Sequence, residues 1–193
     1  MNDIGIVVLA AGASRRFGAP KLAATIDGVP LIRVVASAAS ATGAKVVVVT
    51  GAHRDVLEPH LADLAVEFAF NADWAGGMGG SIACGIGRLD ATIDAAIVML
   101  GDQPLIGSAE LQRLIDAHTH ASGRIVAAQF SGVLGPPCLF PRQYFAELAA
   151  LRGDHGARGV LQRHAAQVEA LPLSAAAADI DTPADYARLF GFA

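Results

Sequence analysis

The sequence predicts an α/β fold: a doubly wound, mostly parallel sheet with helices on both faces, in three layers. Short apolar runs rich in branched residues alternate with segments of helical spacing, which is the element order of repeated βαβ units. The runs are apolar almost throughout, as expected of strands covered on both faces. With 193 residues and 53% hydrophobic content, the chain can bury one such core, and we expect a single domain over residues 1–193.

Five runs are predicted to be strands because they are short, apolar and rich in branched residues. They are IGIVVLA at 4–10, KVVVVT at 45–50, VEFAF at 66–70, AAIVML at 95–100 and RIVAAQF at 124–130. The segment GVLGPPCLF at 132–140 interrupts the alternation with two adjacent prolines. We expect it to form an antiparallel or edge excursion.

Segments with helical spacing lie between the strands. Four of them begin at Pro30, Arg54, Ser81 and Ser108, and two more, QYFAELAAL and GARGVLQRHAA, follow the excursion. In the segment from Ser108, apolar residues recur on one face and Ser108 is the predicted N-cap. The alanine-rich patch at 174–179 is consistent with either a short helix or a loop.

The composition argues against several functional classes. A net charge of -4 and the lack of a lysine or arginine block argue against nucleic-acid binding, which needs a basic surface. No apolar run approaches the ~20 residues of a membrane-spanning helix, and an acidic residue precedes the first apolar stretch. We therefore expect a cytoplasmic protein with a small-molecule partner and no nucleic-acid or membrane contact.

Cysteines and histidines form no recognisable site in the sequence. Cys84 and Cys138 make no disulfide framework or paired metal motif, and each has apolar neighbours. His118 and His120 are two residues apart in a predicted helix, so they do not share a face. Neither a redox function nor a zinc enzyme is expected.

The turn after the first strand, AAGASRRFGAPK at 10–21, carries the first chemical signal. Ligands of open α/β sheets bind beyond the carboxyl ends of the strands. Gly12 and Gly18 permit backbone conformations and close approaches that side chains forbid, and successive N–H groups in such a turn can surround an anion. Arg15, Arg16 and Lys21 add positive charge suited to phosphate. This turn therefore predicts a polyphosphate site.

Three other interpretations of this turn were weighed. A P-loop would read GxxxxGK[ST], but Gly12 to Gly18 is one residue too long and Lys21 lies three residues further on. A dinucleotide fingerprint would read GxGxxG, and Ser14 stands where its second glycine would be. The third interpretation is a solvated loop whose basic residues serve solubility. Its position directly after the first strand favours ligand binding.

Two acidic turns are the second signal. Asp102 follows the fourth predicted strand in GDQP, and Asp181 lies in ADIDTPADY. A carboxylate beside a triphosphate calls for a cation between them, and Mg2+ typically takes one or two carboxylates together with phosphate oxygens. Asp102 could instead cap a turn, and Asp181 could cap the helix that begins near Pro183, unless Thr182 does so.

These motifs together resemble those of a known family. LAAGASRRFGAPK resembles the LAAGxSxRMGxxK signature of nucleotidyltransferases that join a nucleoside monophosphate to a phosphorylated acceptor, and GDQP and DIDTPADY resemble their metal-binding turns. Within this MobA-like superfamily, LAAG, GGMGGSIACGI and LRGDHGARGVL are similar to the molybdenum cofactor cytidylyltransferases. The similarity runs from Ile4 to Tyr186. Phe17 replaces the usual methionine, and GGMGGS is a loose version of the serine-rich turn.

The resemblance implies a nucleotide-diphospho-sugar transferase-like fold and a set of site residues. The implied nucleotide-binding residues are Leu9, Ala10, Ala11, Gly12, Ser14, Arg16, Lys21, Gly80 and Ser81. Arg16, Lys21 and Asp102 are the implied catalytic residues, and Asp102 and Asp181 would share Mg2+. Asp154 and Arg158 would lie near the acceptor. The alternatives are a flexible linker for the loop at 76–81 and an ordinary interhelical turn for GDHGAR.

The resemblance also implies a reaction. The terminal phosphate of a molybdopterin acceptor would attack the α-phosphorus of CTP and pyrophosphate would leave, with a molybdoenzyme as a possible recipient of the product. One alternative is a relative that uses another nucleoside triphosphate, or a sugar phosphate or other phosphorylated acceptor. A second is a chaperone that binds a nucleotide or pterin cofactor without turnover. The sequence does not predict the base preference, because backbone groups that contact a base are common to all residue types and leave no pattern in the sequence.

Overall fold

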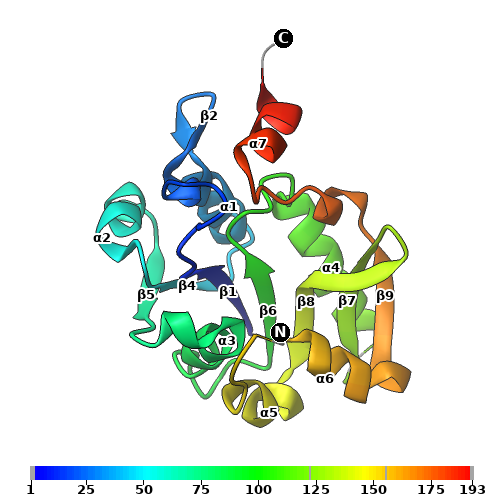
Figure 1. The fold of residues 1–193 in the computed structure, drawn as a ribbon. Helices are drawn as coiled ribbons and strands as arrows, with labels where there is room; N and C mark the ends of the chain where they lie inside the picture. The colour runs from blue at the N-terminus through cyan, green and yellow to red at the C-terminus, as the bar shows by residue number, and fades with distance from the viewer. Residues whose placement is uncertain (1–2, 122, 155, 192–193) are drawn as a thin grey trace.

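The computed structural model describes residues 3–121, 123–154 and 156–191 (Figure 1). Within these residues one seven-stranded sheet has the order β5-β4-β1-β6-β8-β7-β9. The strands are β1 (Ile4–Ala10), β4 (Lys45–Thr50), β5 (Val66–Phe70), β6 (Ala95–Leu100), β7 (Ile125–Phe130), β8 (Val133–Pro141) and β9 (Val168–Pro172). All adjacent pairs are parallel except those of β8, which runs antiparallel to both β6 and β7.

Helices cover both faces of this sheet. They are α1 (Leu31–Ser40), α2 (Arg54–Leu57), α3 (Met78–Ile86), α4 (Ser108–His120), α5 (Phe145–Ala149), α6 (Arg158–Arg163) and α7 (Pro183–Phe190). Ile6 and Val8 of β1 pack into a core with α1 and α4, whereas Val7 packs on the other face with α3, α5 and α6, because successive strand side chains alternate between faces. The predicted three-layer, mostly parallel fold is confirmed.

The strand predicted as an excursion is antiparallel, but it does not lie at an edge. β8 sits between β6 and β7. Its ladder with β7 is regular up to the pair Ala127–Cys138 and resumes at Ala128–Gly135. Pro136 and Pro137 fall in the bulge between these pairs, where a missing N–H breaks no ladder hydrogen bond.

Two predicted helix starts need correction. α3 begins at Met78 instead of Ser81, so most of the predicted loop at 76–81 is its first turn. A Cβ at Gly79 would lie 2.8 Å from the backbone nitrogen of Arg152, so this glycine allows close packing. The N-cap of α4 is Gly107, not Ser108, because the Glu110 carboxylate accepts from the Gly107 N–H at 3.0 Å.

Two small elements were not predicted. The strands β2 (Thr25–Ile26) and β3 (Val29–Pro30) form a short hairpin, and α7 lies beside it (Figure 1), where the Tyr186 hydroxyl donates to the Thr25 carbonyl. β9 adds an edge strand that is only half buried.

The alanine-rich patch forms a 3-10 turn at Ser174–Ala177. No helix in the described part of the chain is long and apolar enough to cross a membrane.

Candidate functional site

A cavity of about 520 Å3 opens at the carboxyl ends of β1 and β6. Backbone and side chains of the first turn form one wall, the start of α3 forms another, and two acidic turns complete the rim. Its lining residues are Leu9, Ala10, Ala11, Gly12, Ala13, Ser14, Arg15, Lys21, Leu22, Trp74, Ala75, Gly77, Met78, Ser81, Leu100, Asp102, Asp154 and Asp181. We call it the first cavity.

The first turn is held in shape by its own backbone. The Ser14 carbonyl accepts from the N–H groups of Phe17 at 3.0 Å and Gly18 at 3.2 Å. Ser14 adopts a φ of 52°, a left-handed conformation that is uncommon outside glycine and that clusters at functional sites. The Ala13 carbonyl contacts Nε2 of His53 at 3.1 Å. This scaffold fixes the turn against the loop after β4.

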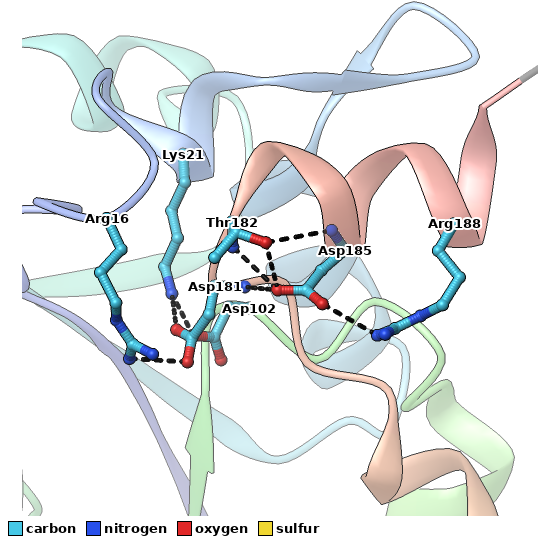
Figure 2. A network of polar contacts seen from close by, with 7 residues as sticks. All are labelled: Arg16, Lys21, Asp102, Asp181, Thr182, Asp185 and Arg188. Atoms are coloured by element: carbon cyan, nitrogen blue, oxygen red, sulfur yellow. Dashed lines mark hydrogen bonds and ion pairs between the residues drawn. The ribbon is translucent and has the colours of Figure 1, made fainter.

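A cluster of opposite charges lies at the rim of the first cavity (Figure 2). Nζ of Lys21 lies 2.5 Å from Oδ2 of Asp102 and 2.9 Å from Oδ1 of Asp181. Nη2 of Arg16 contacts the other oxygen of Asp181 at 2.7 Å. The structure thus brings together the basic turn and both acidic turns, which are 81 and 160 residues away from Lys21 in sequence.

Burial makes this cluster electrostatically strong. The side chains of Lys21 and Asp102 are 14% and 17% exposed, and that of Asp181 is 30% exposed. Burial opposes the charge of Lys21, but the two carboxylates outweigh it and raise its pKa. Burial raises the pKa of Asp102 although Lys21 acts against this. Lys21 is therefore held in its charged form, and its charge is directed at the two carboxylates.

The carboxylate of Asp102 has an oxygen suited to a cation. Its Oδ1 is buried and has no hydrogen-bond partner among the described residues, which is costly unless a ligand satisfies it. No group of three or more His, Cys, Asp or Glu side chains in the described part of the chain could hold a metal. A site of two carboxylates fits Mg2+ that takes its remaining ligands from phosphates and water.

Asp181 faces the cluster because its neighbour caps the helix. Thr182 is the N-cap of α7, and its hydroxyl accepts from the Asp185 N–H at 3.2 Å. The Asp185 carboxylate in turn accepts from the N–H groups of Asp181 and Thr182. The Ile180 N–H donates to the Asp102 carbonyl at 3.0 Å, which joins the two acidic turns. The capping role weighed for Asp181 therefore falls to Thr182.

Not every residue implied by the resemblance lines the first cavity. Arg16 is 72% exposed, pairs with Asp181 and lies outside the lining, whereas Arg15 lines the cavity and has no ion-pair partner within the described ranges. Gly80 is absent from the lining, but Ser81 is present, and its hydroxyl accepts from Nδ2 of Asn71 at 3.0 Å.

The loop at 76–81 was expected to approach the nucleotide, but the two residues before it were not. Trp74 and Ala75 line the first cavity, and Trp74 is the single tryptophan of the chain. The rule that ligands bind beyond the carboxyl ends of strands applies to β5 as it does to β1. Applied to the residues after Phe70, that rule could have found Trp74.

A second cavity of about 210 Å3 adjoins the first. The two share Leu9, Met78 and Leu100. Its remaining lining residues are Ile82, Val98, Leu134, Gly135, Pro136, Cys138, Gly156, Ala157, Arg158 and Leu161. We call it the apolar cavity. The two residues expected near the acceptor are divided between the cavities, since Asp154 lines the first and Arg158 lines the second.

A model of the MobA-like NTP transferase domain matches residues 6–168, which is most of the chain. The chain belongs to this family of nucleotidyltransferases. This MobA-like transferase is 30% identical to the purine catabolism protein PucB of Bacillus subtilis over 93% of the chain and 92% of the relative. It is also 34% identical to the bifunctional protein GlmU of Cutibacterium acnes, over 58% of the chain but only 28% of that longer relative.

Several solved structures share this fold. Rv0371c of Mycobacterium tuberculosis superposes with a TM-score of 0.87 and 26% identity, over 99% of this chain and 98% of that one. A structure of Rv0371c in complex with manganese gives a TM-score of 0.83 at 26% identity, over 99% of both chains. A CMP:2-keto-3-deoxy-manno-octonic acid synthetase complexed with CTP shares the fold at 14% identity, with a TM-score of 0.78 over 97% of both chains. The expected nucleotide-diphospho-sugar transferase-like fold is confirmed.

Proposed function

We propose that this MobA-like transferase transfers CMP from CTP to the terminal phosphate of a molybdopterin-type acceptor and releases pyrophosphate. The observation that carries the proposal is the charge cluster of Lys21, Asp102 and Asp181 at the rim of the first cavity. Family membership supports nucleotidyl transfer. The motifs LAAG, GGMGGSIACGI and LRGDHGARGVL support the CMP and pterin assignments, with a molybdoenzyme as recipient of the product.

In this proposal the nucleotide occupies the first cavity. Backbone groups at 9–12, which line this cavity, hold the base and ribose. Ser14 and Lys21 contact the phosphates, as does Arg16 once it exchanges Asp181 for a phosphate oxygen. We add Arg15 to this set, because it lines the cavity and a guanidinium presents paired donors to phosphate.

The reaction requires no protein nucleophile. A terminal phosphate oxygen of the acceptor attacks the α-phosphorus of CTP in line, a new P–O bond forms, and the bond to pyrophosphate breaks. Since two anions must approach each other, the protein contributes alignment and positive charge from Lys21 and the arginines. When bound, Mg2+ on Asp102 and Asp181 supplies further positive charge to the phosphoryl oxygens. The manganese complex of Rv0371c supports a divalent ion in this family.

A direct assay tests the proposed function. The purified chain is incubated with Mg2+, with molybdopterin or a sugar phosphate as the acceptor, and with CTP, GTP, ATP or UTP in turn. Pyrophosphate release is measured together with nucleotide binding, which is followed through the fluorescence of Trp74. We expect release with CTP above the other three. Faster release with another nucleotide or with a sugar phosphate would replace the proposal by the related transferase. Binding without release in any combination would instead support a cofactor-binding chaperone.

A further inference from the structure

The apolar cavity differs from the first cavity in the chemistry of its wall. Among the lining residues that the structure describes only Arg158 is charged, and no side chain of this set carries a hydroxyl, an amide or a carboxylate. The first cavity, in contrast, is lined by Ser14, Asp102 and Asp181 among others. A ligand that spans both cavities therefore meets polar groups at one end and an apolar surface at the other.

Two polar groups in the wall of the apolar cavity are already paired with protein atoms. The Cys138 thiol donates to the Gly135 carbonyl at 3.1 Å. The Pro136 carbonyl accepts from Nε2 of the buried Gln103 at 3.1 Å. A hydroxyl-rich ligand in this space would lose hydrogen bonds to water without finding replacements here, and each such loss costs about 1–3 kcal/mol.

The rim of the apolar cavity carries exposed groups that a ligand would cover. Leu134 is 37% exposed and Met78 is 44% exposed, so a ligand in the cavity would remove apolar surface from water. Arg158 lines the same cavity, is exposed and forms no ion pair with any residue that the structure describes. Its guanidinium is available for an anionic group.

This cavity lies where the proposed reaction needs space for the acceptor. In that reaction the phosphate of the acceptor must reach the α-phosphorus in the first cavity, so the rest of the acceptor must lie in an adjoining space. The apolar cavity adjoins the first along Leu9, Met78 and Leu100. Its walls come from α3, β6, β8 and α6, so the antiparallel strand β8 supplies the side opposite the nucleotide turn.

We propose that the apolar cavity binds the non-phosphate part of the acceptor and selects a body with an apolar or aromatic face over a hydroxyl-rich sugar, with Arg158 as the cation for an acidic group of the acceptor. This inference rests on the proposed function and narrows its substrate class. It makes Leu134 and Arg158 specificity-determining residues. The selection follows from the wall chemistry, because apolar surface leaving water favours binding while unpaired hydroxyls oppose it.

Equilibrium binding tests the inference with three simple probes. Benzyl phosphate, glucose 1-phosphate and benzyl alcohol are titrated by calorimetry into the chain preloaded with Mg2+ and a non-hydrolysable CTP analogue. We expect benzyl phosphate to bind about tenfold or more tightly than glucose 1-phosphate, a ratio that one well-buried apolar group can supply. Equal binding of the two phosphates, or tighter binding of glucose 1-phosphate, would overturn the inference.

Matched variants locate the binding site. Leu134→Asn should weaken benzyl phosphate about tenfold and leave glucose 1-phosphate unchanged, whereas Val133→Asn should change neither, because Val133 is its 50% exposed neighbour on β8 and lies outside the lining. Both positions are exposed, so folding is retained. Equal effects of the two variants would contradict the assignment.

Arg158 is tested separately. A fourth probe, 4-carboxybenzyl phosphate, carries a second acidic group on the ring that would occupy the apolar cavity. Arg158→Gln should reduce the preference for this probe over benzyl phosphate while leaving benzyl phosphate binding unchanged, since only the carboxylate is expected to reach Arg158. An unchanged preference would remove Arg158 from the site. Binding of the CTP analogue is followed in parallel through Trp74. Loss of nucleotide binding in the unaltered chain would refute the proposed function, whereas normal nucleotide binding with no probe preference would refute only this inference.

Discussion

In the described residues a lysine bridges two carboxylates in each of two clusters. Lys21 lies between Asp102 and Asp181 at the rim of the first cavity, and Lys45 lies between Glu67 and Asp90, at 3.0 and 2.5 Å from their oxygens. In the second cluster the carboxylates are 57% and 62% exposed. Water and salt screen such exposed ion pairs, so they contribute little to the free energy of unfolding.

The difference between the clusters is one of setting, not of residue type. The Lys45 cluster joins β4 to β5 and to the loop after α3, and neither of the two cavities is lined by it. The Lys21 cluster is largely buried, borders a cavity and leaves Oδ1 of Asp102 without a hydrogen bond in the described residues. Ion pairs acquire a chemical role where burial strengthens them and a ligand can reach them.

Alanine substitution should distinguish the two lysines by its effect on the rate of pyrophosphate release. Lys21→Ala should reduce pyrophosphate release by about 10²- to 10³-fold, taking an oxyanion-hole donor, worth about 2.7–4 kcal/mol, as the nearest analogue. Lys45→Ala should leave the rate unchanged. Steady-state kinetics measure both, and circular dichroism checks that both variants fold. A normal rate in Lys21→Ala would remove this residue from the mechanism.

A second comparison pairs the carboxylates. Asp102→Ala should reduce pyrophosphate release by about 10²-fold or more, because it removes both a cation ligand and the partner of Lys21. Asp90→Ala removes the matching partner of Lys45 and should leave turnover intact. The rates are measured over a range of Mg2+ concentrations. Equal rates for the two variants would show that the clusters do not differ in function.

The same contrast between buried and exposed groups applies to two glutamines. Gln103 is 2% exposed and donates to the carbonyls of Pro136 and Ala176, whereas Gln112 is exposed and contacts Asp116 on the surface of α4. Gln103→Leu should lower the free energy of unfolding by about 1–3 kcal/mol, since two buried carbonyls lose a donor. Gln112→Leu should have almost no effect. Urea denaturation of both variants gives the comparison, and similar midpoints would contradict it.

The smallest expected effect concerns salt. Raising sodium chloride from 0.1 to 1 M should remove any stability difference between Lys45→Ala and the unaltered chain, because the Debye length falls from about 10 to about 3 Å. The stability difference caused by Lys21→Ala should persist, because this cluster is partly shielded from solvent. Thermal unfolding at the two salt concentrations tests this. If high salt removed the stability differences of both variants, the two clusters would be screened equally and this expectation would be wrong.

Much of the fold could be predicted from local pattern. The runs predicted as strands match β1, β4, β5 and β6 at both ends. A short run that is apolar throughout is typical of a strand covered on both faces of a sheet. β9 was missed because VEALP is short and only half buried. The start of α3 was misplaced because glycines were interpreted as a loop, whereas Gly79 and Gly85 allow close packing.

The site could be predicted less completely. The basic turn and the turn at Asp102 were identified because residues after parallel strands gather at one edge of the sheet. Asp181 was identified from the acidic sequence ADIDTPADY at a predicted helix start. Pairing within the cluster was not predicted, because it depends on side-chain directions across segments far apart in sequence. Composition gave no means of choosing between Arg15 and Arg16, yet only Arg15 lines the first cavity. The apolar cavity was also missed, since β8 supplies part of its wall through a bulge that local pattern does not show.

We propose that the first cavity binds a nucleotide together with a divalent ion held by the carboxylates of Asp102 and Asp181. The most direct test is a titration of CTP followed by the fluorescence of Trp74, with and without Mg2+, in the unaltered chain and in Asp102→Asn. We expect saturable binding that Mg2+ tightens in the unaltered chain and does not tighten in the variant. Absence of binding, or an equal effect of Mg2+ in both proteins, would contradict the account.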